Sequence, residues 1–253
     1  MKGPDRFDGL FSDDVLRDYL QLNDRAMRQA VSRISAECEI MRSKREGAED
    51  FSDEINGILS MCCRIMQISE LHGMLACDTE KESEVVSLTE YLKDFLNGCS
   101  ELLDGVCELS LMCSGEMLIS VSKYVLTYIL LLFVRQSVLD GAAEMHFSCT
   151  ESGNIYSICA RTVNRKKQEY VYFEDFQNKY YEDILRTASE RLGAEITIED
   201  ECMKLAFPKG SEQTTGELHS EKKSIRSALF SDFRVMLSDL KDEREKGAVT
   251  VLK

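Results

Sequence analysis

The chain has 253 residues, of which 43% are hydrophobic, so it can bury one medium core or two small ones. Its net charge is −14, and no long basic stretch is present, which argues against a nucleic-acid partner. The apolar run from Val125 to Val134 is about ten residues long, whereas a membrane span needs roughly 20, and no signal peptide opens the chain. We therefore expect a cytoplasmic protein without membrane insertion.

The ten cysteines lie inside apolar patterns, such as residues 60–66 and 107–113. This placement indicates small buried thiols in a reducing compartment, not a disulfide scaffold. The adjacent pair Cys62 and Cys63 lacks CxxC spacing, and no His/Cys cluster has the spacing of a zinc site. We therefore expect no metal.

Two long helices are predicted for the N-terminal part. From Asp13 to about Arg45 there is no Pro or Gly, and apolar residues recur every seven positions, at Leu20, Met27, Ile34 and Met41. After a Gly-containing turn, apolar positions from Phe51 to His72 alternate in steps of four and three, which suits helix-on-helix packing. Leu59 and Met66 widen this stripe, which predicts more than one neighbouring helix, as in a dimeric four-helix bundle.

Residues 79–208 are predicted to form an α/β sandwich, with helices on one face of a sheet. Strands are expected at 85–88, 107–113, 144–150, 154–162, 194–200 and 202–208, and helices at 89–105, 120–141 and 175–193. The helix at 120–141 is apolar on nearly all sides and is predicted to be buried. The fold class is therefore α+β.

Residues 209–223 are polar and Gly-containing, as in a linker, and an amphipathic helix is predicted from about 224 to 239. Its apolar residues share one face: Ile225, Leu229, Phe233, Met236 and Leu240. Because so short a helix is unstable alone in water, we expect it to bind an apolar surface on its own sandwich or on a partner. The chain thus divides into a helical hairpin (1–78), a sandwich (79–208), and a linker with a helix (209–253).

From about Asp13 to Lys209, this order of elements resembles the cytoplasmic core of bacterial sensor histidine kinases. The apolar pattern at the end of the sandwich, residues 192–209, contributes to the likeness. In that family, a dimerisation and phosphotransfer hairpin precedes a GHKL-type ATP-binding domain with a mixed sheet. The resemblance implies this architecture for the present chain, with the C-terminal amphipathic helix added.

The family's first helix carries a phosphoacceptor histidine. The best match, residues 30–41, keeps Ser32 and places Arg33 at the histidine and Ile34 at the acidic residue after it. A guanidinium is not a nucleophile at neutral pH, so this position is not expected to accept phosphate. His72, at the end of the second helix, is an alternative acceptor, although a seam or surface histidine is the simpler interpretation.

The family's nucleotide pocket begins with two asparagines on a helix, which fall here on Leu132 and Gln136. Gln is one methylene longer than Asn, and Mg²⁺ demands near-ideal octahedral placement. The adenine-reading aspartate falls on Arg161, which cannot accept a hydrogen bond, and the first glycine after it falls on Val163.

The family's glycine-rich phosphate loop is replaced by Lys179, Tyr180 and Tyr181. Two tyrosines would obstruct a backbone that should cradle phosphate. The loss of all four motifs together argues against kinase chemistry, so we expect no catalytic residue and no bound cofactor. Walker, Rossmann, GxSxG and HExxH signatures are also absent from the sequence.

The resemblance thus implies a non-catalytic, histidine-kinase-like homodimer that acts in bacterial two-component signal transduction by binding other proteins. A response regulator or a sensor component is the expected partner. The alternative is a divergent phosphotransferase or histidine kinase that retains nucleotide or phosphate chemistry through other residues. Sporulation-type phosphotransferases also pair a hairpin with a degenerate ATP-binding fold, but they keep the histidine on the first helix.

Overall fold

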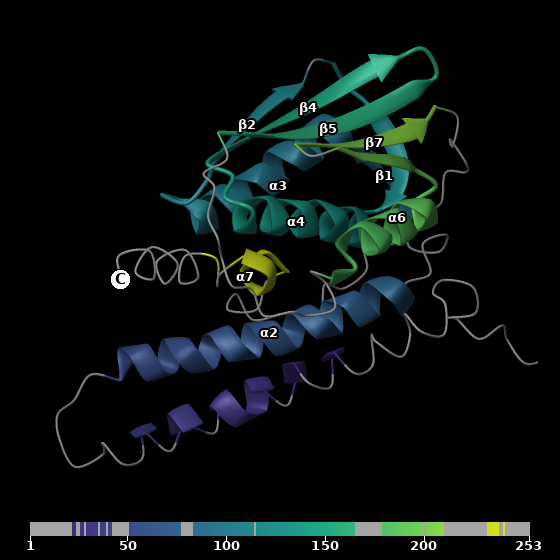
Figure 1. The fold of residues 1–253 in the computed structure, drawn as a ribbon. Coiled ribbons are helices and arrows are strands. Elements are labelled where there is room, and N and C mark those ends of the chain that lie inside the picture. The colour runs from purple at the N-terminus through teal and green to yellow at the C-terminus, as the bar shows by residue number, and fades with distance from the viewer. Residues whose placement is uncertain are drawn as a thin grey trace, which may run out of the picture. The chain divides into compact units, whose positions relative to one another are not determined.

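A computed structural model describes most of the chain (Figure 1). The described residues are parts of 22–41, then 51–76, 83–113, 115–164, 179–199, 201–209, 232–237 and 240. The chain divides into two compact units, the first comprising Met1–Ala76 with Tyr172–Tyr181 and the second comprising Cys77–Val171 with Glu182–Lys253. None of the described helices is long and apolar enough to cross a membrane.

In the first unit, the described residues between 22 and 41 are helical and precede the 25-residue helix α2 (Ser52–Ala76). The two segments meet at Gly57, where an added Cβ would lie 3.1 Å from Oε1 of Glu37. The buried apolar side chains of α2 are Met61, Cys63, Ile68, Leu71 and Met74. The prediction that the positions from Phe51 to His72 form the packed stripe was therefore wrong: of those whose side chains are described, Ile55 and Ser69 are exposed and the others are only partly buried.

The second unit contains a five-stranded sheet in the order β2-β4-β5-β7-β6. Its strands are β2 (Glu108–Cys113), β4 (Glu144–Ser152), β5 (Ile155–Val163), β6 (Glu195–Glu199) and β7 (Cys202–Pro208). The β2–β4 pair is parallel and the other pairs are antiparallel, so the predicted mixed sheet is confirmed. The hairpin between β4 and β5 turns at Gly153, whose φ of 58° suits a residue without a Cβ.

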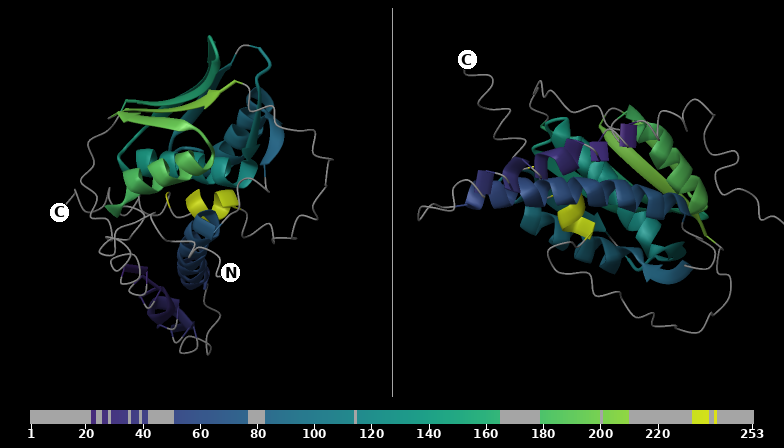
Figure 2. Two further views of the ribbon diagram at one scale, coloured as in Figure 1. Left: turned by 90° about the vertical axis from the view of Figure 1, so that its right-hand side faces the viewer. Right: turned by 90° about the horizontal axis from the view of Figure 1, so that it is seen from below.

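Helices α3 (Leu88–Leu103), α4 (Lys123–Leu139) and α6 (Tyr181–Arg191) lie on one face of this sheet (Figures 1 and 2). Strand side chains alternate accordingly: in β4, Met145 and Phe147 are buried toward the helices, whereas His146 is exposed on the outer face. From Val125 onward, every α4 side chain except Thr127 and Gln136 is buried. The prediction that this apolar helix is a buried element is therefore confirmed.

One strand of the structure was not predicted from the sequence. Strand β3 (Leu118–Ser122) pairs with β1 (Ser83–Ser87) in a separate antiparallel ladder, in which the buried side chains of Val86 and Ile119 face each other. The prediction of a continuous helix from residue 120 was thus wrong at its start. Ser122 ends the strand and caps α4, because its Oγ accepts a hydrogen bond from the N–H of Val125 at 3.5 Å.

The described part of the C-terminal segment is helix α7 (Asp232–Leu237), together with the helical residue 240. Figure 1 shows α7 beneath α3 and α4, on the side of these helices away from the sheet. The rest of the predicted 224–239 helix lies outside the described residues. The helix was predicted to bind either its own sandwich or a partner, and its described part packs on α3 and α4 of its own sandwich.

Candidate functional site

Arg33, the residue at the predicted phosphoacceptor position, lies in the N-terminal helical segment with its side chain 47% exposed. Its Nε is 4.0 Å from Oε1 of Glu37, one helical turn later. The position is therefore accessible to another protein, but it offers a cation paired with a carboxylate. His72 lies in α2, and its side chain is outside the described part of the structure.

The two α4 positions predicted for the nucleotide pocket have different surroundings. Leu132 is 1% exposed and belongs to the apolar core of the sandwich. Gln136 is only partly buried, and its Nε2 donates a hydrogen bond to Oδ1 of Asp140 at 3.1 Å, within the same helix end. Its amide is thus engaged locally, in a typical i,i+4 side-chain pair.

Arg161 lies on β5 with its side chain exposed, opposite His146 of β4 and Cys202 of β7. The next residue, Thr162, is buried on the helix-covered face, and its Oγ1 donates to the carbonyl of Glu201 at 3.3 Å. Because successive side chains of a strand point to opposite faces, Arg161 points away from the helix layer. The structure therefore does not bring Arg161 together with the α4 positions.

Lys179, Tyr180 and Tyr181 belong to the first compact unit, whereas Val163 and the α4 positions belong to the second. Nζ of Lys179 lies 5.3 Å from the centre of the Tyr180 ring, a cation–π contact. The residues at the four predicted motif positions are thus distributed over both units.

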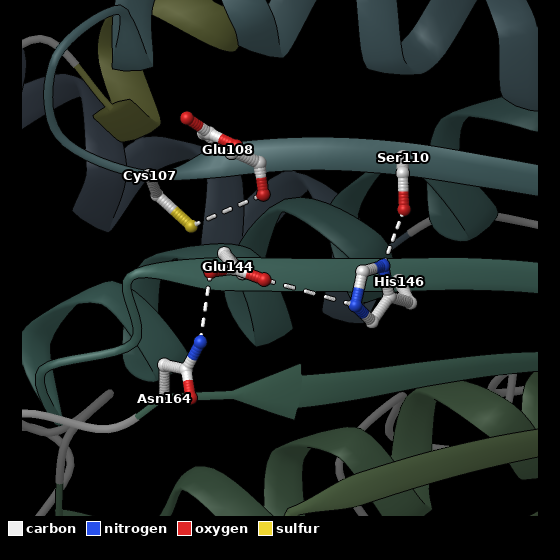
Figure 3. Close-up of polar contacts among 6 residues, drawn as sticks. All are labelled: Cys107, Glu108, Ser110, Glu144, His146 and Asn164. Atoms are coloured by element: carbon white, nitrogen blue, oxygen red, sulfur yellow. Dashed lines mark hydrogen bonds and ion pairs between the residues drawn. The ribbon is translucent and has the colours of Figure 1, made fainter.

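Sequence reasoning did not find a cluster of polar residues on the outer face of the sheet (Figure 3). In this outer-face cluster, Oγ of Ser110 is hydrogen-bonded to Nδ1 of His146. Nε2 of His146 is 4.0 Å from Oε2 of Glu144, whose other oxygen accepts a hydrogen bond from Nδ2 of Asn164 at 2.8 Å. The residues come from β2, from β4 and from the end of β5, and only the register of the strands brings them together.

Serine, imidazole and carboxylate are the groups of nucleophilic hydrolases, so a catalytic role for the outer-face cluster depends on how well it is shielded from water. The side chains of His146 and Glu144 are 52% and 37% exposed. Charge stabilisation in such enzymes depends on preorganised donors in a water-excluded site, where each interaction is strong. At this exposure, the cluster is a solvated hydrogen-bond network on the surface of the sheet.

Two thiols also meet on this outer face, with Sγ of Cys159 3.2 Å from Sγ of Cys202. The register places Cys159 opposite Lys204 and Cys202 opposite Arg161, so the two cysteines are diagonal neighbours. Diagonal Cα atoms lie about 7–8 Å apart in such ladders, which is beyond the usual span of a disulfide. Burial, followed by the nearby Cys159, raises the pKa of Cys202 to about 11, so this thiol is protonated at neutral pH.

Arg135 of α4 is a buried cation that no sequence pattern identified. It is only 6% exposed, and its Nη1 donates a hydrogen bond to the carbonyl of Met236 in α7 at 2.7 Å. The partner lies 101 residues further along the chain. Among the described residues, no group of three or more His, Cys, Asp or Glu side chains is placed to hold a metal ion.

Comparisons with known proteins extend these observations. No protein-family model matches the sequence, and no curated protein matches it. Among solved structures, the histidine kinase AdeS of Acinetobacter baumannii is 8% identical, with a TM-score of 0.51 over 72% of this chain and 96% of AdeS. The histidine kinase ThkA, solved in complex with the response regulator protein TrrA, is 13% identical, with a TM-score of 0.54 over 76% of this chain and 61% of ThkA. The chain therefore has a histidine-kinase-like fold.

Proposed function

We propose that this protein is a non-catalytic, histidine-kinase-like component of bacterial signal transduction that acts by binding other proteins in the cytoplasm. The observation that carries the proposal is the exposed, helical position of Arg33, which the sequence predicts to stand where sensor histidine kinases have their phosphoacceptor histidine. A guanidinium that stays protonated at neutral pH cannot attack a phosphoryl group. The fold is thus combined with a side chain unsuited to the family's chemistry.

The residues aligned with the nucleotide motifs support the same conclusion. Leu132 is packed in the core, the amide of Gln136 is bound to Asp140, and Arg161 points to solvent on the far face of the sheet. Phosphoryl transfer depends on magnesium, a phosphate cradle and in-line positioning. None of these three side chains, in its described surroundings, supplies a ligand for magnesium or phosphate beside α4.

A response regulator is the partner class that the proposal favours, since the similar structure of ThkA was solved with one bound. We also propose that the protein works as a homodimer through its N-terminal helices. Several apolar side chains are exposed on these helices, namely Met27, Val31 and Ile40 on the first segment and Ile55 and Leu59 on α2. Such a stripe is typical of a surface that another helix covers.

The test is to incubate the purified chain with Mg-ATP and, separately, with a phosphorylated response regulator encoded by the same organism, followed by intact-mass spectrometry. We expect no phosphate on the chain in either reaction, whereas surface plasmon resonance should detect regulator binding that requires the helical unit. An active histidine kinase core serves as the positive control. Phosphate transferred to the chain from the regulator would replace this proposal with the divergent phosphotransferase, and phosphate from ATP would replace it with an active kinase.

A further inference from the structure

The outer face of the sheet carries a pair of neighbouring thiols. Sγ of Cys159 on β5 lies 3.2 Å from Sγ of Cys202 on β7, and both side chains are partly exposed. The two residues are 43 positions apart and meet only through the register of the two strands. The sequence spacing that argues against a zinc site therefore does not apply to this pair.

A disulfide fits this thiol pair poorly, whereas a bridging metal ion fits it well. Diagonal Cα atoms of an antiparallel ladder are about 7–8 Å apart, which is too wide for a direct S–S bond. With metal–sulfur bonds of about 2.3 Å, two thiolates that share one ion have sulfur atoms about 3.3 Å apart at a right angle and about 4.6 Å apart in a line. The observed 3.2 Å corresponds to the bent arrangement, and rotation about the Cα–Cβ bonds widens it toward the linear one.

The neighbours of the two cysteines determine which ion the thiol pair suits. The residues paired with them across the ladders are two cations, a hydroxyl and a carboxylate, namely Arg161, Lys204, Ser148 and Glu199. Protonated arginine and lysine are not ligands, and among the described residues no third His, Cys, Asp or Glu side chain completes a metal-binding group. Zinc requires four ligands, whereas copper(I), a soft ion that prefers thiolates, forms stable complexes with two.

The charges beside the thiols favour a complex that is negative overall. Two thiolates around a monovalent ion carry one net negative charge, whereas around a divalent ion they carry none. Burial, followed by Cys159, raises the pKa of Cys202, and Arg161 opposes this rise. Arg161 is therefore placed to stabilise negative charge at the sulfur of Cys202, and Lys204 stands opposite Cys159 as a second cation.

We propose that Cys159 and Cys202 form a binding site for one copper(I) ion on the outer face of the sheet. Each cysteine binds the ion as a thiolate and releases its proton, so two thiols and one Cu⁺ give a bis-thiolate complex with one negative charge and two H⁺. Arg161 acts as the counter-ion of this complex and not as a ligand. The site does not depend on whether the protein is catalytic or dimeric.

The first experiment titrates the reduced, full-length chain with copper(I) bicinchoninate in the absence of oxygen and follows the loss of colour as the protein takes up the ion. We expect Cys159→Ser and Cys202→Ser each to bind one ion fewer per chain than the wild type. Cys113→Ser is the matched control, because Cys113 pairs with the buried Cys149 on the helix-covered face, and it should bind as many ions as the wild type. Equal uptake by the wild type and Cys159→Ser, or a loss of the same size in Cys113→Ser, would overturn the proposal.

Two further measurements test the choice of ion. Arg161→Glu should weaken copper(I) binding by about tenfold or more, because a nearby charge typically shifts such an equilibrium by about one pK unit or more, whereas Arg161→Lys should retain the wild-type affinity. Zinc(II) should bind the wild type and the double variant Cys159→Ser/Cys202→Ser equally, since two thiolates leave half of its tetrahedral shell empty. An unchanged copper(I) affinity of Arg161→Glu, or zinc uptake that the double variant loses, would overturn the assignment of a negative copper(I) complex.

The last measurement needs no variant and stays decisive if the substitutions impair folding. Because two thiols release two protons for each ion, the affinity of the wild type for copper(I) should rise by about a hundredfold per pH unit near neutral pH. X-ray absorption of the same complex should show two sulfur neighbours around copper and no nitrogen. A rise of only about tenfold per pH unit, or a nitrogen neighbour, would indicate a single cysteine or a histidine and would overturn the proposal.

Discussion

Arg33→His separates a protein that lacks only its phosphoacceptor from one that also lacks the apparatus for phosphoryl transfer. The substitution places an imidazole on an exposed helix, at the position predicted to correspond to the phosphoacceptor histidine of sensor histidine kinases. If the nucleotide pocket were functional, this residue would become labelled by ATP. We expect no acid-labile phosphate on the variant, and no ATP binding by calorimetry at millimolar nucleotide.

The structure makes a negative result interpretable, because the substitution should scarcely affect stability. The pair of Arg33 with Glu37 spans 4.0 Å between side chains that are 47% and 20% exposed, and i,i+4 pairs near the surface contribute about 0.3–0.5 kcal/mol. The lower helix propensity of His adds about 0.5 kcal/mol at most. The total of about 1 kcal/mol is small beside a typical unfolding free energy of about 5–15 kcal/mol, so the variant should remain folded.

The catalytic deficit, by contrast, should be large. Loss of a single charge-stabilising donor typically costs about a hundredfold to a thousandfold in rate, and in this variant the three predicted nucleotide motifs would still hold unsuitable residues. The assay is autophosphorylation with γ-labelled ATP, followed by acid and base treatment of the product. Arg33→Gln is the control, since it removes the ion pair without adding a nucleophile. Label on Arg33→His but not on Arg33→Gln would refute the inert interpretation and show that the pocket had been assigned to the wrong residues.

Leu59→Glu should convert the proposed dimer into a monomer, because it places a charge in the exposed apolar stripe. Light scattering tests this prediction, with Asn56→Glu at an exposed position as the control, and a wild type that is monomeric at micromolar concentration would contradict it. Gly98→Ala should change the unfolding free energy by less than about 1 kcal/mol, because the higher helix propensity of alanine offsets its close contact with the Phe233 ring. Hydrogen exchange of the α7 amides should become faster, and unchanged exchange would show that the ring moves to accommodate the added methyl group. Since the pKa of Cys202 is raised to about 11, the alkylation rate of this thiol should reach half its maximum near that pH. The contribution of the thiol to stability should be complete below about pH 9 and should be lost as the pH rises toward 11. Urea unfolding of the wild type and of Cys202→Ala at both ends of that range tests the stability effect, and equal losses in the two proteins would rule out this thiol as the cause.

Much of the sandwich could be predicted from local sequence because its signals are local. The hairpins β4–β5 and β6–β7 each join neighbouring strands with alternating apolar residues, and both were predicted from that pattern. Strand β3 was missed because it runs directly into α4 without a turn, so its last residues were assigned to the start of that helix. A five-residue strand that pairs with the distant β1 leaves little local signal.

The polar sites were harder to predict, since each depends on pairing between distant segments. Ser110 and His146 are 36 residues apart and meet only because β2 and β4 are parallel and in that register. The partner of Arg135 is a backbone carbonyl, which no residue type marks in a sequence. The resemblance predicted that Arg161 lies in one nucleotide pocket with Leu132 and Gln136 of α4. In the structure, the alternation of side chains along β5 places Arg161 on the face of the sheet away from α4.

The bond between Arg135 and Met236 has a consequence for synthesis of the chain on the ribosome. Residues 101 positions apart, made at about 5–20 residues per second, emerge roughly 5–20 s apart. During that interval α3 and α4 are complete, but the apolar surface that α7 covers has no covering segment. Nascent chains should therefore expose this surface until α7 has emerged from the ribosome, which makes it a binding site for chaperones and a point of aggregation when they are scarce.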